Sequence, residues 1–194
     1  MLFRSDLSGM AAFVFTRGNE TVIAFRGTEF SLNDWLTDAG LGLGAVPQQV
    51  VAAYWFYQAA LKLDDVKNSS SISFTGHSLG GALASIMANY TGKSAVVFDP
   101  APNVNTAANL RDGVNPVMEG DGDVTVWPRI PASTSPAGTI TSIVSGGDPL
   151  TREFSDHGGG MLGAQTFLPL NFDPDVFAET EAEFIANIGA ELHS

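Results

Sequence analysis

The stretch at 71–82, Ser-Ile-Ser-Phe-Thr-Gly-His-Ser-Leu-Gly-Gly-Ala, constrains the fold more than any other part of this chain. It combines a short strand pattern, an abrupt turn and an alanine-rich helix start, with Ser78 at the apex of Gly-His-Ser-Leu-Gly. Glycine fits beside a side chain lifted out of such a turn because it has no Cβ. The pattern predicts a nucleophile elbow, whose helix N–H groups face the place where an oxyanion would form. The alternative interpretation is an ordinary glycine-rich turn.

Strand and helix patterns alternate through the middle of the chain. This alternation predicts an α/β fold with a mainly parallel central sheet and helices on both faces. Besides the elbow strand, we expect strands at 11–16, 21–25, 94–98, 124–127, 139–144 and 164–168. We expect helices at 47–63, 79–90, 107–111 and 173–190, a hairpin turn at 17–20 and a polar loop at 64–70.

Three features follow predicted strands of this sheet: the Arg26-Gly27-Thr28 stretch, Ser78 and Asp148. Sites in open parallel sheets form at the carboxyl ends of the strands, so these features are expected to lie along one edge. The strand at 21–25 is nearly continuous in apolar character, which predicts burial on both faces.

The composition excludes several classes of function. With 194 residues the chain is expected to form one domain, 1–194. The net charge of −12 argues against nucleic acid as a partner and against attraction to anionic lipid surfaces. The absence of cysteine excludes disulfides, thiolate catalysis and cysteine metal sites. No apolar run is long enough to span a membrane, so stable membrane insertion is not expected.

A serine nucleophile needs a base in contact with it and an acid behind that base. The chain has three histidines, at positions 77, 157 and 193. His77 adjoins Ser78 in the elbow, where its side chain is expected to point away from the serine and into packing. His157 and His193 therefore remain as candidates for the base. Asp99 and Asp148 are the candidates for the acid, since both follow predicted strands.

Two motifs occur in the order in which the class 3 (fungal-type) lipases have them, and they give the chain a resemblance to this family. One is the elbow at 74–81; the other is Val-Ile-Ala-Phe-Arg-Gly-Thr at 22–28, followed by Asp-Trp-Leu-Thr-Asp at 34–38. The stretches at 94–102 and 139–158 match more loosely. The resemblance implies an α/β-hydrolase fold that acts on carboxylic esters of lipids and requires no cofactor.

The resemblance also implies roles for particular residues. Ser78 matches the nucleophile, and Thr28 matches the oxyanion residue of the family's Arg-Gly-[Ser/Thr] motif. Leu79, directly after the nucleophile, would supply the second oxyanion N–H. Asp148 matches the acid in preference to Asp99. His193 matches the position of the base in preference to His157-Gly158, which resembles a structural His-x-Gly stretch of the family.

The expected function is therefore a serine carboxylic-ester hydrolase, of the triacylglycerol lipase or esterase type, with an acyl-enzyme on Ser78. Lipid ester at a lipid–water interface is the expected partner. A phospholipase A or thioesterase on the same scaffold is one alternative. A lipid-binding domain that keeps the elbow but lacks a working base is another.

Three weaker features of the sequence, and the location of the protein, allow more than one interpretation. The turn Asp121-Gly122-Asp123 offers two carboxylates for calcium, although a solvated acidic loop is the more ordinary interpretation. Residues 30–47 are a candidate lid with glycines in their second half. An aromatic group consists of Trp35, Tyr54, Trp55, Phe56 and Tyr57, and could line an acyl groove or simply pack a helix. The resemblance favours a secreted protein, although the sequence contains no signal peptide; trimming of both ends from a longer protein is compatible with this.

Overall fold

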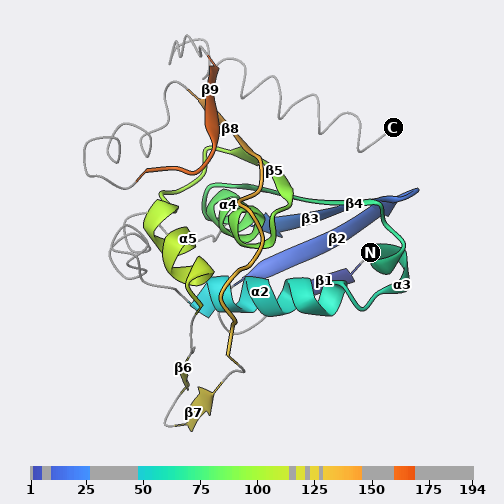
Figure 1. Cartoon of the computed structure of the whole chain (residues 1–194), viewed down its shortest axis with the longest axis vertical. Helices are drawn as coiled ribbons and strands as arrows, with labels where there is room; N and C mark the ends of the chain where they lie inside the picture. The colour runs from blue at the N-terminus through green and yellow to red at the C-terminus, as the bar shows by residue number, and fades with distance from the viewer. Residues whose placement is uncertain are drawn as a thin grey trace, which may run out of the picture.

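A seven-stranded sheet dominates the computed structural model (Figure 1). The structure describes residues 2–5, 10–26, 48–113, 117–120, 123–126, 129–145 and 160–168. The sheet has the order β1-β2-β3-β4-β5-β8-β9. Its strands are β1 (Leu2–Ser5), β2 (Ala11–Arg17), β3 (Glu20–Arg26), β4 (Ser71–His77), β5 (Ser94–Phe98), β8 (Ile140–Ser145) and β9 (Ala164–Leu168). A separate antiparallel pair consists of β6 (Val117–Gly120) and β7 (Asp123–Val126).

The sheet is parallel from β3 to β9 and antiparallel at its β1–β2–β3 edge. Local sequence explains the antiparallel edge: Gly18, at φ 62°, supplies the turn between β2 and β3. The crossovers from β3 to β4, from β4 to β5 and from β5 to β8 contain helices, as is usual in βα units. Since β3, β4, β5 and β8 run the same way, their carboxyl ends lie along one edge. The predicted α/β fold with a mainly parallel sheet is confirmed.

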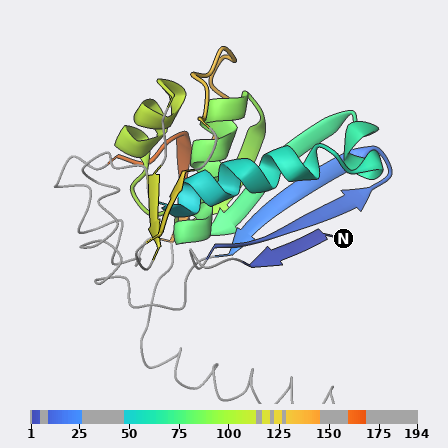
Figure 2. The same ribbon diagram turned by 90° about the horizontal axis from the view of Figure 1, so that it is seen from below.

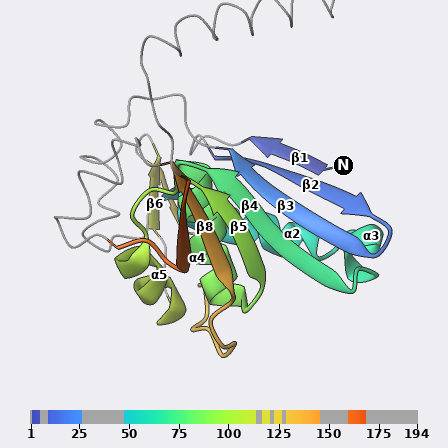
Figure 3. The same ribbon diagram turned by 90° about the horizontal axis from the view of Figure 1, so that it is seen from above.

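The helices that contact the sheet, α2 (Gln48–Ala60) and α4 (Leu79–Thr91), lie on one of its faces (Figures 2 and 3). The described residues therefore do not show the helices that were predicted on both faces. Two shorter helices are α3 (Asp64–Lys67) and α5 (Val104–Arg111), and α5 packs against α4. On β5 the alternation is clear: Ala95 and Val97 are buried, whereas Val96 and Phe98 are exposed on the opposite face. The helix predicted at 173–190 lies outside the described residues.

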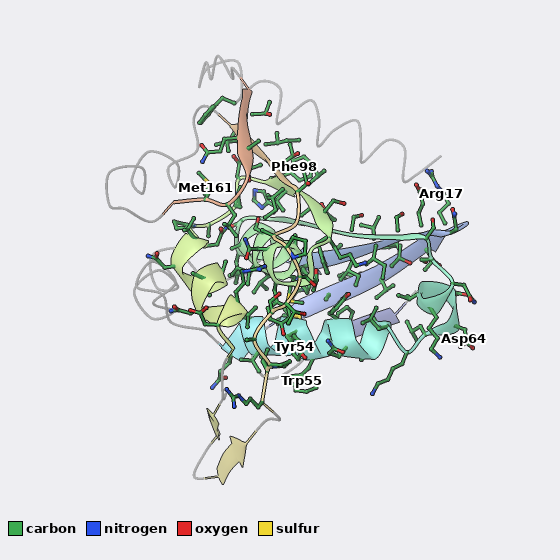
Figure 4. All side chains as sticks on the ribbon, in the orientation of Figure 1. Arg17, Tyr54, Trp55, Asp64, Phe98 and Met161 are labelled. Carbon is green, nitrogen blue, oxygen red and sulfur yellow. The ribbon has the colours of Figure 1, made fainter. Side chains whose placement is uncertain are left out.

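The core forms between the sheet and the face covered by α2 and α4. Phe25 of β3 packs against Phe74 of β4 and Phe56 of α2, with ring centroids 6.1 and 6.4 Å apart. Tyr54 and Tyr57 are buried too, and Tyr54 lies edge-on to Trp55 on the same helix (Figure 4). This part of the predicted aromatic group therefore packs α2 against the core. The largest fully buried side chains include Met10, Ile23, Phe56, Phe74, Leu83, Ile86, Met87, Leu110 and Ile130.

The far end of α4 is held by a hydrogen bond to a residue outside the helix and by a glycine cap. Burial, with a smaller contribution from the neighbouring Tyr54, raises the pKa of Tyr90 to about 12. Its hydroxyl donates to the Pro131 carbonyl at 2.7 Å. Gly92 closes the helix in the left-handed conformation, with its N–H on the Ala88 carbonyl. The elbow helix is therefore fixed at the end opposite Ser78. Within the described part of the chain, no helix is long and apolar enough to cross a membrane.

Three details of the fold differ from the sequence predictions. The expected polar loop at 64–70 begins with the short helix α3, because Asp64 and Asp65 suit the first turn of a helix. Strands β1 and β6 were not expected. The burial expected on both faces of β3 is wrong, because its residues alternate between buried and half-buried positions.

Candidate active site

Ser78 lies where β4 ends and α4 begins, and its backbone is strained. Its φ and ψ are 54° and −123°, a region that residues with a Cβ rarely occupy. Ser78 is the N-cap of α4, yet its side chain makes no capping hydrogen bond. A strained serine with its hydroxyl uncommitted to the helix is the geometry that a nucleophile elbow requires.

The glycines of the motif permit close contacts that other residues would prevent. A Cβ on Gly76 would lie 2.3 Å from the carbonyl oxygen of Gly80. A Cβ on Gly80 would lie 2.2 Å from the Phe25 carbonyl oxygen and 2.8 Å from the carbonyl carbon of Arg26. Both contacts are with backbone atoms, which cannot rotate away. The missing side chains therefore let the first turn of α4 rest directly on the ends of β4 and β3.

The end of β3 is thereby fixed beside the first turn of α4. The last paired residues, Phe25 and Gly76, are directly opposite each other in the parallel register. Thr28, the predicted oxyanion residue, follows Arg26 by two positions and lies outside the described residues. Leu79, the other predicted donor, is the first residue of α4 and is buried. The first N–H groups of a helix have no partner within it, so the Leu79 N–H makes no hydrogen bond inside α4, and its role as an oxyanion donor stays a prediction.

The backbone of Ser78 is bound to the next strand and to the loop after it. The Ser78 N–H donates to the Phe98 carbonyl at 3.0 Å, which extends the pairing of β4 with β5 by one residue. The Ser78 carbonyl accepts from the Ala82 N–H at 3.0 Å and from the Ala101 N–H at 3.2 Å. The strained conformation is therefore held on both sides by hydrogen bonds.

Asp99, one of the two candidate acids, lies at the carboxyl end of β5 and also has a positive φ, 40°. Its Oδ1 accepts from the Ser145 N–H at 2.6 Å and from the Ser145 hydroxyl at 2.9 Å. Ser145 is the last residue of β8. The Asp99 carboxylate thus binds the last residue of the neighbouring strand, β8. This contact was not predicted, although aspartate just after a strand is a signal for a left-handed turn residue.

His77 is the last residue of β4 and is exposed. The expectation that it would point into packing is therefore wrong. In the parallel register it pairs with Phe98, which is exposed at 43%. The two side chains share the face of the sheet opposite α4, and Figure 4 labels Phe98 at this end of β5.

The other predicted site residues lie outside the described residues: Asp148, His157 and His193, together with the candidate lid at 30–47 and Trp35. The acidic turn is described only at Asp123, where β7 begins. Among the residues that the structure describes, no group of three or more histidine, aspartate or glutamate side chains is placed to hold a metal ion.

A mainly parallel sheet and a strained serine between strand and helix together define an α/β-hydrolase fold of the lipase type. The family described as phospholipase-like, with a Tle-like phospholipase domain, matches residues 1–126, and the chain belongs to it. The resemblance to lipases predicted from sequence is confirmed, and the family match makes it more specific.

Two relatives illustrate the similarity. The chain is 33% identical over 109 residues to an extracellular phospholipase A1 of Serratia liquefaciens, a match that covers 56% of this chain and 32% of that protein. The chain thus spans about a third of the length of this relative. The crystal structure of a triacylglycerol lipase from Penicillium expansum aligns with a TM-score of 0.53 at 17% identity, over 86% of this chain and 68% of that one. This second likeness concerns the fold alone.

Proposed function

We propose that this protein is a lipolytic serine ester hydrolase that cleaves an acyl ester of phospholipids. The conformation of Ser78 carries the proposal, because a strained serine at the start of a helix is hard to account for without a chemical role. The phospholipase-like family and the phospholipase A1 relative favour phospholipid as substrate. Triacylglycerol, the first expectation from sequence, becomes the second choice.

In the proposed reaction the Ser78 Oγ attacks the ester carbonyl carbon, and His193 takes the hydroxyl proton. Asp148 orients His193 and stabilises the imidazolium that forms. The backbone N–H groups of Thr28 and Leu79 bind the oxygen that becomes negative, a contribution of about 3 kcal/mol for each donor. The carbon–oxygen bond to the leaving alcohol then breaks, and His193 protonates that alcohol. Water, deprotonated by His193, hydrolyses the acyl-enzyme and restores Ser78.

The net charge of −12 bears on how such an enzyme would reach its substrate. An acidic protein is repelled by anionic lipid surfaces, so zwitterionic phospholipid suits it better. The extracellular relative supports the further proposal that the protein acts outside the cell that makes it.

Fluorophosphonate labelling tests the nucleophile, because the reagent forms a covalent bond with an activated serine. We expect one adduct per chain, located on Ser78 by peptide mass spectrometry and absent from Ser78→Ala. Ser85→Ala is the matched control, since Ser85 lies on the same helix but is fully buried. Labelling elsewhere, or turnover by Ser78→Ala equal to wild type, would contradict the proposal. Absence of any label would favour the lipid-binding alternative.

A substrate panel tests the chemistry of the ester. Phosphatidylcholine vesicles, triacylglycerol emulsions and acyl-coenzyme A are offered at equal acyl concentration, and released fatty acid is measured. We expect kcat/KM to be highest for phosphatidylcholine. Highest turnover of acyl-coenzyme A would identify a thioesterase, and highest turnover of triacylglycerol a lipase in the narrow sense.

Two histidine variants test the base. His193→Ala is expected to lower kcat by about 10⁴-fold or more, as removal of a triad base does in other serine hydrolases. His157→Ala is expected to retain turnover within about threefold of wild type, since a position without a role in catalysis has little effect on the rate. The reverse result would transfer the role of base to His157.

A further inference from the structure

The loop between β5 and α5, residues 99–103, makes hydrogen bonds with Ser78 and with two other stretches of the chain. Its Ala101 N–H donates to the carbonyl of Ser78 at 3.2 Å. Its first residue, Asp99, binds Ser145 at the end of β8. Its last residue, Asn103, binds the stretch just before β9. One short loop therefore links the nucleophile to two separate points of the chain.

Asn103 makes its contacts from a buried position, at 1% exposure. Its side-chain Oδ1 accepts from the Leu162 N–H at 3.0 Å, and its Nδ2 donates to the Ala101 carbonyl at 2.9 Å. The backbone N–H groups of Asn103 and Val104 both donate to the Gly160 carbonyl at 3.2 Å. The side chain thus joins the loop that binds Ser78 to the chain at 160–162.

Asp99 makes the corresponding link at β8. A carboxylate oxygen that accepts from both the N–H and the hydroxyl of Ser145 makes charge-assisted bonds, which are stronger than neutral ones. The residue adopts a φ of 40° to do so, and its own N–H donates to the Ile143 carbonyl at 2.9 Å. The end of β8 is therefore held against the loop by backbone and side chain together.

The two anchored points, Ser145 and 160–162, border the segment 146–159 in the sequence. That segment carries Asp148, the proposed acid, three residues after Ser145. We propose that Asp99 and Asn103 are positioning residues, which fix both ends of this segment relative to Ser78. The inference rests on the proposed function, since it concerns the geometry of that site. It also assigns Asp99 a role other than that of the acid.

Kinetics of four variants test the inference, with circular dichroism melts to establish that each one is folded. Asp99→Ala and Asn103→Ala are expected to lower kcat about 10- to 100-fold with KM within about twofold, because displacement of a catalytic group by about 1 Å has such an effect. Asp99→Asn keeps an acceptor oxygen and is expected to lose no more than about tenfold. Ser145→Ala keeps the N–H bond to Asp99 and is expected to lose about threefold. The matched controls Asp65→Asn and Asn68→Ala, both exposed on or beside α3, should retain wild-type kcat.

A second readout separates positioning from mere structural support. If Asp99 and Asn103 act through Asp148, their alanine variants should cost less than about threefold when added to Asp148→Asn, since effects through one group are not additive. A full additional loss in that background would overturn the inference.

Two other results would also overturn it. One is unchanged kcat in folded Asp99→Ala and Asn103→Ala. If these variants do not fold, unchanged kcat in both Asp99→Asn and Ser145→Ala would overturn the inference instead. The other is a loss of about 10⁴-fold in Asp99→Asn, which would make Asp99 the acid itself. Failure of the proposed function is distinct, because Ser78→Ala would then retain wild-type turnover.

Discussion

Two adjacent strand ends in this molecule share a backbone strain and differ in what their side chains do. Ser78, after β4, and Asp99, after β5, are the residues other than glycine with a positive φ in the described part of the chain. Each continues the ladder to the next strand: the Ser78 N–H binds Phe98, and the Asp99 N–H binds Ile143. At Ser78 the side chain makes no capping bond, whereas at Asp99 the carboxylate makes two bonds to Ser145.

The difference indicates two uses of the same conformation. A positive φ costs about 1–3 kcal/mol at a residue with a Cβ, so each must be stabilised by its surroundings. At Asp99 the side chain itself supplies stabilising bonds. At Ser78 the backbone supplies the hydrogen bonds, and the neighbouring glycines permit the close contacts. The hydroxyl is therefore left for chemistry. The strained conformation of Ser78 is thus stabilised by backbone hydrogen bonds and the glycines around it, whereas that of Asp99 is stabilised by bonds of its own side chain.

The largest expected effect follows from the support outside Ser78. Gly80→Ala is expected to destabilise the protein by more than about 4 kcal/mol, since its Cβ would lie 2.2 Å from a backbone oxygen of β3. Either the fold is lost or α4 moves away from β3 and the site opens. Chemical denaturation followed by tryptophan fluorescence measures the change in free energy of unfolding.

Gly18→Ala is the matched control for this substitution. Gly18 has a φ of 62° but no atom within 4 Å of an added Cβ, so only backbone strain is introduced. That strain is expected to cost about 1 kcal/mol. Equal destabilisation by the two alanines would mean that close contact does not support the elbow.

The elbow at Ser78, the helix after it and the β2–β3 turn were predicted well from the sequence, because their signals are local. The spacing of glycines around Ser78 defines the elbow within a few residues, and Gly18 marks the β2–β3 turn in the same way. The helix at 79–90 also follows from its own composition. The close contact of Gly80 with β3 was not predicted, because the partner strand lies far away in sequence.

The contacts of the loop after β5 could not be predicted as well, because they join residues that are distant in sequence. Asp99 and Ser145 are 46 positions apart, and Asn103 and Leu162 are 59 apart. Nothing in the local pattern distinguishes an aspartate that closes a neighbouring strand from one that serves as an acid. Strand β1 poses the same difficulty, because its place at the sheet edge depends on pairing with β2.

The second expected effect compares the two strained residues directly. Asp99→Gly removes the strain but leaves the N–H and hydroxyl of Ser145 without their acceptor. The lost bonds outweigh the relief, so we expect a net destabilisation of about 1–2 kcal/mol. Asp112→Gly, in the exposed turn after α5, is the matched control for loss of an aspartate. Stabilisation by Asp99→Gly would show that the carboxylate does not support its own conformation.

The smallest expected effect has the opposite sign. Ser78→Gly removes the same kind of strain and loses no capping hydrogen bond, so the folded state gains about 1–3 kcal/mol. Greater freedom of glycine in the unfolded chain offsets about 1 kcal/mol of that gain. We expect a net stabilisation of about 1 kcal/mol in denaturant titration, together with loss of fluorophosphonate labelling. Ser78→Ala keeps the Cβ and should show no such gain, so the difference between the two variants isolates the strain at the elbow. If both variants have the stability of wild type, the conformation of Ser78 is not strained in solution, and the contrast with Asp99 no longer holds.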